Sequence, residues 1–264
     1  MTTAPNEPVL LRRDEGRVAI LTLNRPHAMN ALSGELIDAL QAEFDKLAKD
    51  KEIRCVVIEA KGRAFSSGHD LREVASSLDY GFHHDLLTRC SAMMLSIRRL
   101  PQPVIAKVQT IATAAGCQLV AACDLAVASS EATFATSGIN NGLFCGTPSV
   151  PLGRNVGSKR ALDMLFTGEP IGAETALRDG LVSRVVPPAE LDRATLDLAN
   201  TIAAKSPLVL AQGKELFHKH MEMGLEQAYA YATAYMAGAV KREDAKLGID
   251  AFVNKQGLPE WKGR

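Results

Sequence analysis

Residues 112–124 read ATAAGCQLVAACD, and the interpretation of the whole sequence starts from this stretch. Within it, the small-residue turn Thr113–Gln118 lies between a predicted strand and an apolar helical run. A second turn of the same kind, Ala64–Leu71 (AFSSGHDL), directly follows another predicted strand. Small residues at such junctions let a ligand approach the backbone, and the unpaired N–H groups of a helix N-terminus favour a developing anion. One amide from each turn could therefore form an oxyanion hole.

The sequence around these turns alternates strand patterns with helix patterns. Ser33 is predicted to cap a helix whose apolar residues recur at helical spacing. These residues are Leu36, Ile37, Leu40, Phe44 and Leu47. A second helix, around Leu86–Arg99, ends before two prolines that cannot continue it. The predicted strands are Val18–Leu23, Cys55–Glu59, Val104–Val108 and Leu125–Ala128. This order favours a mixed α/β core with right-handed crossovers.

From about Ser158 onwards the pattern becomes mainly helical. Helices are predicted over residues 158–166, 173–179, 188–204, 206–222, 225–240 and 242–254, and the run Leu181–Val186 resembles a strand. We therefore expect an α/β body over residues 1–200 and a helical region over residues 201–264. The segment Met221–Val240 is rich in Ala, Met and Tyr with little charge, which fits either an intramolecular core or a subunit interface.

Composition and charge exclude several classes of protein. Lys and Arg total 30, as do Asp and Glu, so the formal net charge is zero and a dedicated binder of nucleic acid or anionic membrane is disfavoured. The five cysteines show no metal-binding spacing, so we predict reduced thiols and no metal site. Residues 1–20 lack a signal-peptide pattern, and no apolar run is long enough to span a bilayer. The sequence thus predicts a cytoplasmic protein.

Five ordered motifs carry a resemblance to a known family. They are Leu23–Pro26 with Met29–Leu32, then Ala64–Leu71, Ala114–Asp124, Leu165–Pro170 and Gly248–Phe252. Together they resemble the crotonase, or enoyl-CoA hydratase/isomerase, superfamily, and within it the mitochondrial enoyl-CoA hydratase domain-containing proteins. The resemblance implies a crotonase-type spiral of ββα turns with a C-terminal helical trimerisation region. It also implies homotrimers or dimers of trimers.

The resemblance further implies which residues bind an acyl-CoA thioester. The two oxyanion N–H groups would come from His69 and Ala115. Residues expected near the CoA adenine, ribose or phosphates are Arg25, His27, Ala28, Ala64, Ser66, Ser67, Asp70 and Leu71. Phe252 and Lys255 resemble the aromatic and basic residues that close over CoA, often in a neighbouring subunit. CoA would enter as part of the substrate, without a separate cofactor.

The sequence departs from the hydratase pattern at both catalytic glutamates. Gln118 stands where the first glutamate is expected, and an amide can orient water but cannot accept its proton. Gly138 stands at the position of the second and has no side chain. Cys145 lies where other family members place a catalytic carboxylate. A thiolate there could act as a nucleophile or base, and the alternative is a small buried apolar residue.

Three functional interpretations follow. In the first, the protein is an enzyme of fatty acid metabolism that stabilises a thioester enolate with other groups. This could be an isomerase, or a synthase-like enzyme that uses a bound bicarbonate as base, as in dihydroxynaphthoyl-CoA synthases. In the second, it binds acyl-CoA without catalysis. In the third, it is a plain enoyl-CoA hydratase, a lyase, of low activity.

Overall fold

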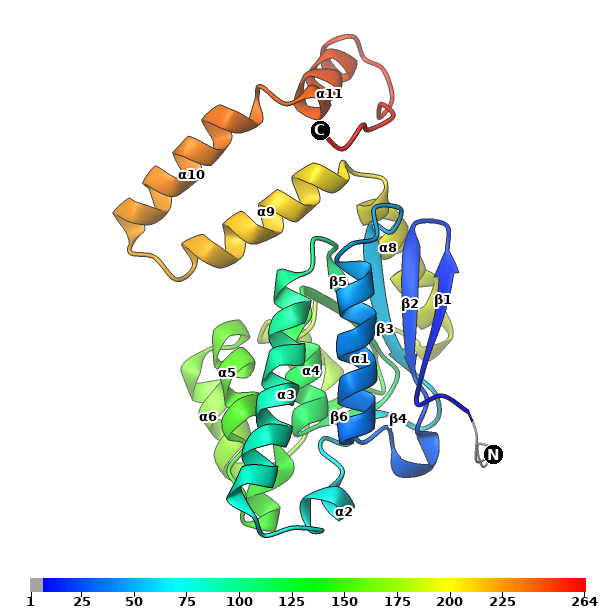
Figure 1. The fold of residues 1–264 in the computed structure, drawn as a ribbon, viewed down its shortest axis with the longest axis vertical. Coiled ribbons are helices and arrows are strands. Elements are labelled where there is room, and N and C mark those ends of the chain that lie inside the picture. Colours follow the sequence, from blue (N-terminus) through cyan, green and yellow to red (C-terminus); the bar gives the residue numbers. More distant parts are fainter. Residues whose placement is uncertain (1–6) are drawn as a thin grey trace.

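Two sheets form the centre of the computed structural model, which describes residues 7–264 (Figure 1). The larger sheet has the order β1-β2-β3-β5-β7-β10. Its strands are β1 (Leu10–Glu15), β2 (Val18–Leu23), β3 (Cys55–Ala60), β5 (Val104–Val108), β7 (Leu125–Ser129) and β10 (Arg184–Val186). Only the β1–β2 pair is antiparallel, and the other neighbours are parallel. The α/β fold predicted from the sequence is thus confirmed.

The smaller sheet carries the turns that the sequence singles out. Its order is β4-β6-β8-β9, and its strands are β4 (Ala64–Ser66), β6 (Ile111–Thr113), β8 (Thr133–Ala135) and β9 (Ile171–Gly172). β4 pairs in parallel with β6, and β6 pairs in parallel with β8. Because the carboxyl ends of parallel strands meet at one edge, the residues that follow these three strands come together there.

The strands in the middle of the larger sheet are apolar almost without interruption because both of its faces are covered, and β2 is buried at every residue. One face packs against α1 (Gly34–Leu47), α3 (Tyr80–Arg99) and α4 (Ala115–Ala122) in the main core. The other face packs against α8 (Leu191–Ala203). In β2, Ala19 and Leu21 belong to the first core, whereas Val18 and Ile20 belong to the second.

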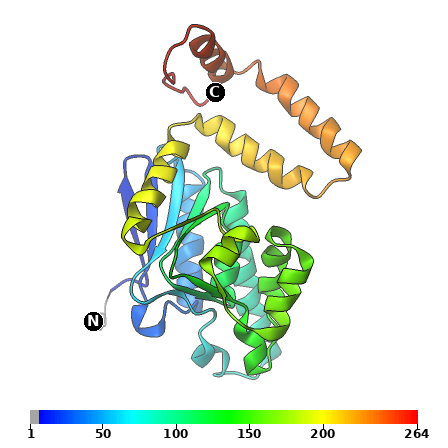
Figure 2. The same cartoon turned by 180° about the vertical axis from the view of Figure 1, so that it is seen from behind.

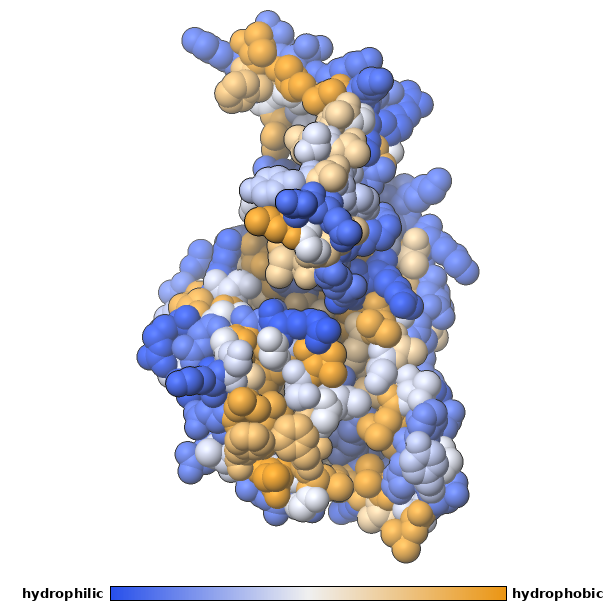
Figure 3. All heavy atoms as spheres, turned by 90° about the vertical axis from the view of Figure 1, so that its left-hand side faces the viewer, coloured by the Kyte–Doolittle hydropathy of each residue, from blue (hydrophilic) through white to orange (hydrophobic). Residues whose placement is uncertain are grey.

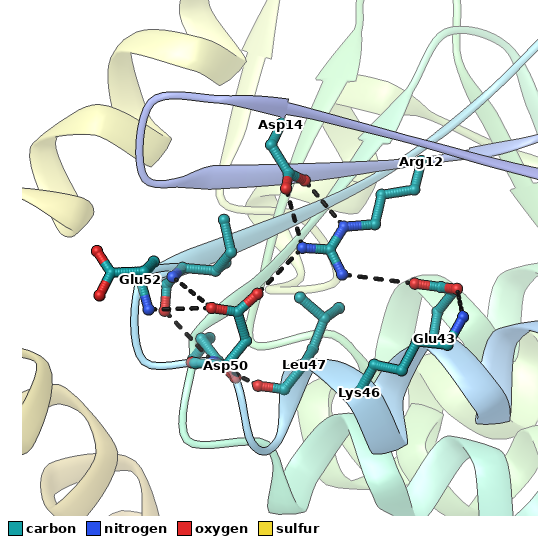
Figure 4. A network of polar contacts seen from close by, with 9 residues as sticks. Arg12, Asp14, Glu43, Lys46, Leu47, Asp50 and Glu52 are labelled. Atoms are coloured by element: carbon teal, nitrogen blue, oxygen red, sulfur yellow. Dashed lines mark hydrogen bonds and ion pairs between the residues drawn. The ribbon is translucent and has the colours of Figure 1, made fainter.

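The predicted α1 helix forms as its sequence pattern requires. Ser33 Oγ accepts a hydrogen bond from Leu36 N at 3.3 Å, which is the expected N-cap. All five of its predicted apolar residues are buried. At its far end, Arg12 of β1 joins Asp14, Glu43 and Asp50, so that one guanidinium ties the edge strand to α1 and to the turn after it (Figure 4).

The remaining short elements surround the edge where the turns meet. They are the 3-10 helices η1 (Pro26–Ala28), η2 (Ser137–Asn141) and η3 (Pro188–Glu190), and the helices α2 (Leu71–Val74), α5 (Gly146–Asn155), α6 (Ser158–Thr167) and α7 (Ala173–Arg178). The sequence did not predict the strands of the smaller sheet or α2, and residues 64–66 form β4 although they were predicted to belong to a turn. Three further features were also not predicted. α3 begins at Tyr80 instead of Leu86, β1 is an additional edge strand, and α5 forms in spite of its prolines.

The last three helices project from the body as an arm (Figures 1 and 2). They are α9 (Pro207–His220), α10 (Leu225–Ala239) and α11 (Glu243–Val253), as the sequence predicted. Asp244 is 1% exposed and accepts hydrogen bonds from Ser206 Oγ, Lys262 N and Gly263 N, which ties the end of the chain to the start of α9.

The arm corrects one interpretation of the segment Met221–Val240. Neither α9 nor α10 contains a buried residue within the described chain. Intramolecular core is therefore the wrong interpretation of that segment, because the rest of the chain does not cover α10. The subunit interface and the domain division at residue 200 both stay predictions.

Candidate functional site

The two small-residue turns interlock at two glycines. Gly68 has φ +96°, and a Cβ added to it would lie 2.8 Å from Ala114 Cβ and 3.2 Å from Ala115 N. A Cβ on Gly116 would lie 2.8 Å from the carbonyl carbon of Ser66 and even closer to the oxygen. Both turns therefore require glycine, since only its backbone permits so close an approach. The contact brings the amide of Ala115 beside Gly68, the residue before His69.

The amides of His69 and Ala115 are both left without an acceptor. Leu32 N donates to Gly68 O at 2.7 Å and Leu32 O accepts from Asp70 N at 3.4 Å, so the amide of His69 points away from this bridge. Ala115 is the first residue of α4, where an N–H has no partner within the helix. Among the hydrogen bonds of residues 7–264, none is donated by either nitrogen. The two amides therefore fit the predicted pair of oxyanion donors.

Ala114, which caps α4, has a strained backbone. Its φ of 50° and ψ of −120° lie outside the regions that residues with a Cβ normally occupy. Its own N–H donates to Ala135 O at 2.9 Å, which helps to hold this conformation. Strain of this kind costs of order 1–3 kcal/mol and clusters at functional sites. The strained turn directs the start of α4 towards Gly68.

A pocket of about 360 Å³ opens beside the first turn. It contains His69 and six of the eight residues predicted to lie near the CoA head group, namely Arg25, His27, Ala28, Ser67, Asp70 and Leu71. Ala31 and Arg72 also line the pocket. They were not predicted, because the family resemblance assigned neither residue a contact with the ligand. The side chains of Ala64 and Ser66 are fully buried in β4, so only their backbone could contact a ligand.

An ion pair controls the charge of this pocket. Arg25 Nη2 lies 2.9 Å from Asp70 Oδ2, and both side chains are about five-sixths buried. Arg25 also donates to Ala31 O at 2.6 Å. Burial alone would raise the pKa of Asp70, but hydrogen bonds from Arg25 and from the Arg72 amide outweigh burial and hold that pKa below its ordinary value. Asp70 therefore partly neutralises the arginine that an anionic ligand would meet.

The imidazole of His69 is enclosed and uncharged. Neither of its ring nitrogens has a hydrogen-bond partner among the described residues. Burial lowers the pKa of His69, so the ring is neutral at neutral pH. A neutral imidazole can donate one hydrogen bond and accept another.

The two positions that replace the glutamates have different surroundings. Gln118 is 4% exposed, and its Oε1 has no partner among the described residues. A Cβ on Gly138 would lie 2.7 Å from Leu143 O and 2.8 Å from Cys145 Sγ. Gly138 N donates to that sulfur at 3.3 Å. The space in which a side chain at Gly138 would begin is thus occupied by Cys145 and Leu143.

The cysteine thiols are all buried. Each of the five is free of a disulfide, as the sequence predicted. Burial raises the pKa of Cys145, and the hydrogen bond from Gly138 offsets this only partly. The thiol of Cys145 is therefore protonated at neutral pH, which disfavours a thiolate nucleophile.

Phe252 and Lys255 lie far from this pocket within one chain. Phe252 belongs to α11, at the opposite end of the molecule from α2, which begins beside the pocket (Figure 1). Its side chain is 84% exposed. A role for either residue at the CoA pocket therefore requires a second copy of the chain.

A larger cavity, of about 940 Å³, lies between α9 and the body. Gln118 reaches it from α4, Met94 and Arg98 from α3, Val150 from α5, and Lys214 from α9. The sequence did not predict this cavity, because its wall combines four helices that are distant along the chain. Asp124 lies at the same place, and its Oδ2 accepts a hydrogen bond from Val104 N at 2.7 Å.

Two kinds of feature are absent from residues 7–264. No helix there combines the length and the apolar character needed to cross a membrane. No three side chains from His, Cys, Asp or Glu in those residues are grouped as metal ligands would be.

The chain is similar to known proteins over nearly its full length. The family described as "Enoyl-CoA hydratase/isomerase" matches residues 13–264. "Enoyl-CoA hydratase domain-containing protein 3, mitochondrial" from Mus musculus is 43% identical over 249 residues, which are 94% of this chain and 83% of that protein. A crystal structure of enoyl-CoA hydratase from Mycobacterium smegmatis is 50% identical, covers 97% of this chain and 99% of its own, and has a TM-score of 0.94. The crystal structure of human enoyl Coenzyme A hydratase domain-containing protein 3 is 42% identical in sequence and has a TM-score of 0.93. The match covers 96% of this chain and 100% of that chain.

These similarities correct the predicted location. Proteins of the same name from five vertebrates, 41–43% identical to this chain, are all named as mitochondrial. The prediction of a cytoplasmic protein is therefore wrong. It relied on the absence of a signal-peptide pattern, which is not informative about mitochondrial transport.

Proposed function

The chain belongs to the enoyl-CoA hydratase/isomerase family, and we propose that it binds acyl-CoA thioesters with the carbonyl oxygen between the N–H groups of His69 and Ala115. The observation that carries this proposal is the close contact between the two turns. It brings the turns together while the N–H groups of His69 and Ala115 donate no hydrogen bond within the described residues. Two such donors stabilise the negative charge that develops on the oxygen when the thioester becomes an enolate. Loss of one donor typically costs about 2.7–4 kcal/mol of transition-state stabilisation.

The pocket of about 360 Å³ suits the CoA head group. It adjoins His69, so a ligand could fill the pocket and still reach the amides. Arg25 supplies positive charge for a phosphate, and Asp70 moderates that charge. CoA is then part of the substrate, and the proposal needs no metal ion or separate cofactor.

The assembly that we propose is a homotrimer or a dimer of trimers. The exposed, apolar α10 supports self-association, because monomeric proteins rarely leave large apolar surfaces uncovered. A second apolar patch covers the face that carries α5 and α6 (Figure 3) and includes Phe144 and Phe166, whose ring centroids are 6.2 Å apart. Phe252 and Lys255 would then approach the CoA pocket of a neighbouring chain.

The leading candidate activity is enolate chemistry, nominally the hydration or isomerisation of an enoyl-CoA. Gln118 supports it, because its free Oε1 can accept a hydrogen bond from a water or a substrate hydroxyl. Bound bicarbonate as the base has little support, since the Gly138 amide already donates to Cys145 Sγ. Cys145 itself is a weak candidate for a base because burial raises its pKa.

The alternative is an acyl-CoA-binding protein without catalysis. The surroundings of Gly138 favour it, because Leu143 and Cys145 occupy the position from which a catalytic side chain would extend. In this case the two amides would hold the thioester but no group would remove or deliver a proton.

Spectroscopy and turnover together test the proposal. A cinnamoyl-CoA chromophore should shift to longer wavelength on binding, because donors at the carbonyl oxygen stabilise its polarised form. Crotonyl-CoA should then be followed by loss of its conjugated absorbance. A red shift with turnover supports the enzyme, and a red shift without turnover supports the silent binder. Binding without any red shift, or no binding, contradicts the amide pair.

A further inference from the structure

A buried carboxylate joins two distant segments at the end of the arm. Asp244 lies near the start of α11 and is 1% exposed. Its Oδ2 accepts hydrogen bonds from Ser206 Oγ at 2.5 Å and Gly263 N at 3.0 Å, and its Oδ1 accepts one from Lys262 N at 2.7 Å. One side chain thus binds both the N-cap of α9 and residues 258–264, which we call the tail.

The tail is also attached through the only tryptophan of the sequence. Trp261 Nε1 donates to Ala204 O, at the end of α8, at 2.8 Å. A Cβ added to Gly248 of α11 would lie 3.2 Å from one atom of the indole ring and 3.3 Å from another, so the ring packs against that helix. Among the described residues, no helix or strand packs extensively against α11. Asp244 and the tail are therefore its main attachment.

The side chains of α11 differ in exposure along the helix. Asp244 and Ala251, two turns apart, are its buried residues. The other apolar residues Ile249, Phe252 and Val253 are between 53% and 84% exposed. The attachment at Asp244 therefore decides the direction in which these exposed side chains point.

We propose that Asp244 is a positioning residue, which fixes α11 so that Phe252 and Lys255 are presented to the CoA pocket of a neighbouring chain. This inference rests on the proposed function and on the proposed assembly. Asp244 touches no ligand in it and acts through the tail and α11. Because α11 and the pocket beside α2 lie at opposite ends of one chain, loss of Asp244 should weaken the pocket of a neighbour and leave its own intact (Figure 1).

The position requires a carboxylate because all three side-chain partners of Asp244 donate hydrogen bonds. In Asp244→Asn the amide nitrogen replaces one oxygen, and a nitrogen that carries two hydrogens cannot accept from these donors. At least one donor of the tail or of Ser206 then loses its acceptor, which is costly at a buried site. We therefore expect the tail to detach, and Trp261 fluorescence should report this directly.

The first experiment measures detachment and CoA binding on the assembled full chain. Asp244→Asn should increase the quenching of Trp261 by acrylamide and lower the affinity for CoA about tenfold, as loss of an aromatic contact does. Asp250→Asn is the matched control, because it removes the same charge from an exposed position of the same helix and should change neither quantity. An attached tail in Asp244→Asn, or a detached tail with unchanged CoA affinity, overturns the proposal.

Mixed assemblies test whether Asp244 acts on a neighbouring chain. Arg25→Met removes the positive charge of the pocket but leaves α11 intact, so Arg25→Met and Asp244→Asn should each bind CoA weakly alone. Both chains would be co-expressed with different tags and purified as mixed assemblies. In a head-to-tail trimer, about one pocket in three then combines the intact pocket of one chain with the intact α11 of the other, and should bind CoA as the unmodified protein does. An effect confined to the chain that carries Asp244 would restore no pocket.

The possible failures have different meanings. If Asp244→Asn does not assemble, Trp261→Ala removes the other attachment of the tail, and it must lower CoA affinity and recover in mixed assemblies in the same way. Mixed assemblies without a restored pocket overturn the role of Asp244 and leave the proposed function intact. An unmodified protein that binds neither CoA nor an acyl-CoA overturns the proposed function itself.

Discussion

The two amides that would bind the thioester and the two positions that would move protons are built in opposite ways. The amides of His69 and Ala115 are fixed by backbone contacts between Gly68, Ala114 and Gly116. Proton transfer at positions 118 and 138 depends on side chains. In this sequence Gln118 carries an amide and Gly138 has no side chain. A site made of backbone amides restricts the sequence only at the positions that must be glycine. A side-chain site can change its chemistry by one substitution, so the thioester can be inferred more directly than the reaction.

The largest effect should come from breaking the contact between the two turns. In Gly116→Ala the new methyl group would overlap the Ser66 carbonyl, which is backbone and cannot rotate away. We expect a loss of about 3 kcal/mol or more in the free energy of unfolding and loss of acyl-CoA binding. Denaturant titration and calorimetric titration with crotonyl-CoA measure the two effects.

Gly153→Ala is the control for this change. Gly153 lies inside α5, and a Cβ there meets nothing within 4 Å. Alanine should therefore be neutral or stabilise by up to about 1 kcal/mol. Equal effects at residues 116 and 153 would show that the turns do not interlock.

A smaller effect is expected at Gly138. The methyl group of Gly138→Ala would press on Leu143 O and Cys145 Sγ, and we expect a loss of about 2 kcal/mol. Cys145→Ala removes one of these two contacts, so the double variant should recover about 0.5–1 kcal/mol relative to the sum of the single changes. A double-mutant cycle by chemical denaturation measures this coupling. Strict additivity would mean that the sulfur is not what fills the space.

Gln118→Glu should change both stability and chemistry. The glutamate would be nearly as buried as Gln118, so its folded-state pKa should lie above its unfolded value of about 4.3. The folded state then binds the proton more tightly, and stability falls as the pH rises from about 4.3 through the folded pKa. A shift of one pKa unit corresponds to about 1.4 kcal/mol. Thermal unfolding from pH 4 to pH 8 measures it, and a pH-independent difference from the parent protein contradicts it.

Sequence reasoning predicted most helices and, in the larger sheet, every strand except β1, because apolar spacing reflects burial; it predicted no strand of the smaller sheet, whose strands have only two or three residues. It missed β1, because the consecutive charged residues Arg12, Arg13 and Asp14 hide the strand pattern. It also missed α5, because Pro148 and Pro151 usually interrupt a helix.

The close approach of the two turns could be predicted, since small residues are the signal for it, whereas the choice of His69 and Ala115 came from the family resemblance. The cavity beside Lys214 could not, because the sequence gives no distance between α3 and α9. Likewise the occupation of the Gly138 position by Cys145 Sγ appears only in three dimensions.

The smallest effect is expected in the pocket itself. Asp70→Asn keeps the N-cap of α2 but removes the charge that pairs with Arg25. Free CoA should bind about threefold more tightly, less so at high salt. Fluorescence competition at two salt concentrations measures it.

The pH dependence of the unmodified protein gives a second measurement of the same pair. Because the pKa of Asp70 is held below its ordinary value, lowering the pH from 7 to 5 should leave the difference in CoA affinity between the unmodified protein and Asp70→Asn unchanged. That difference should shrink only as the pH falls through the lowered pKa, where Asp70 loses its charge. A change in the difference between pH 7 and pH 5 would assign the effect to another group.

The distance between Phe252 and the CoA pocket has a thermodynamic consequence. If a neighbouring chain supplies Phe252, ligand binding and self-association are linked equilibria. Assembly then tightens ligand binding by the same factor by which the ligand tightens assembly. The apparent affinity of the protein for CoA would depend on protein concentration, and dilution alone would weaken binding without any change in the pocket.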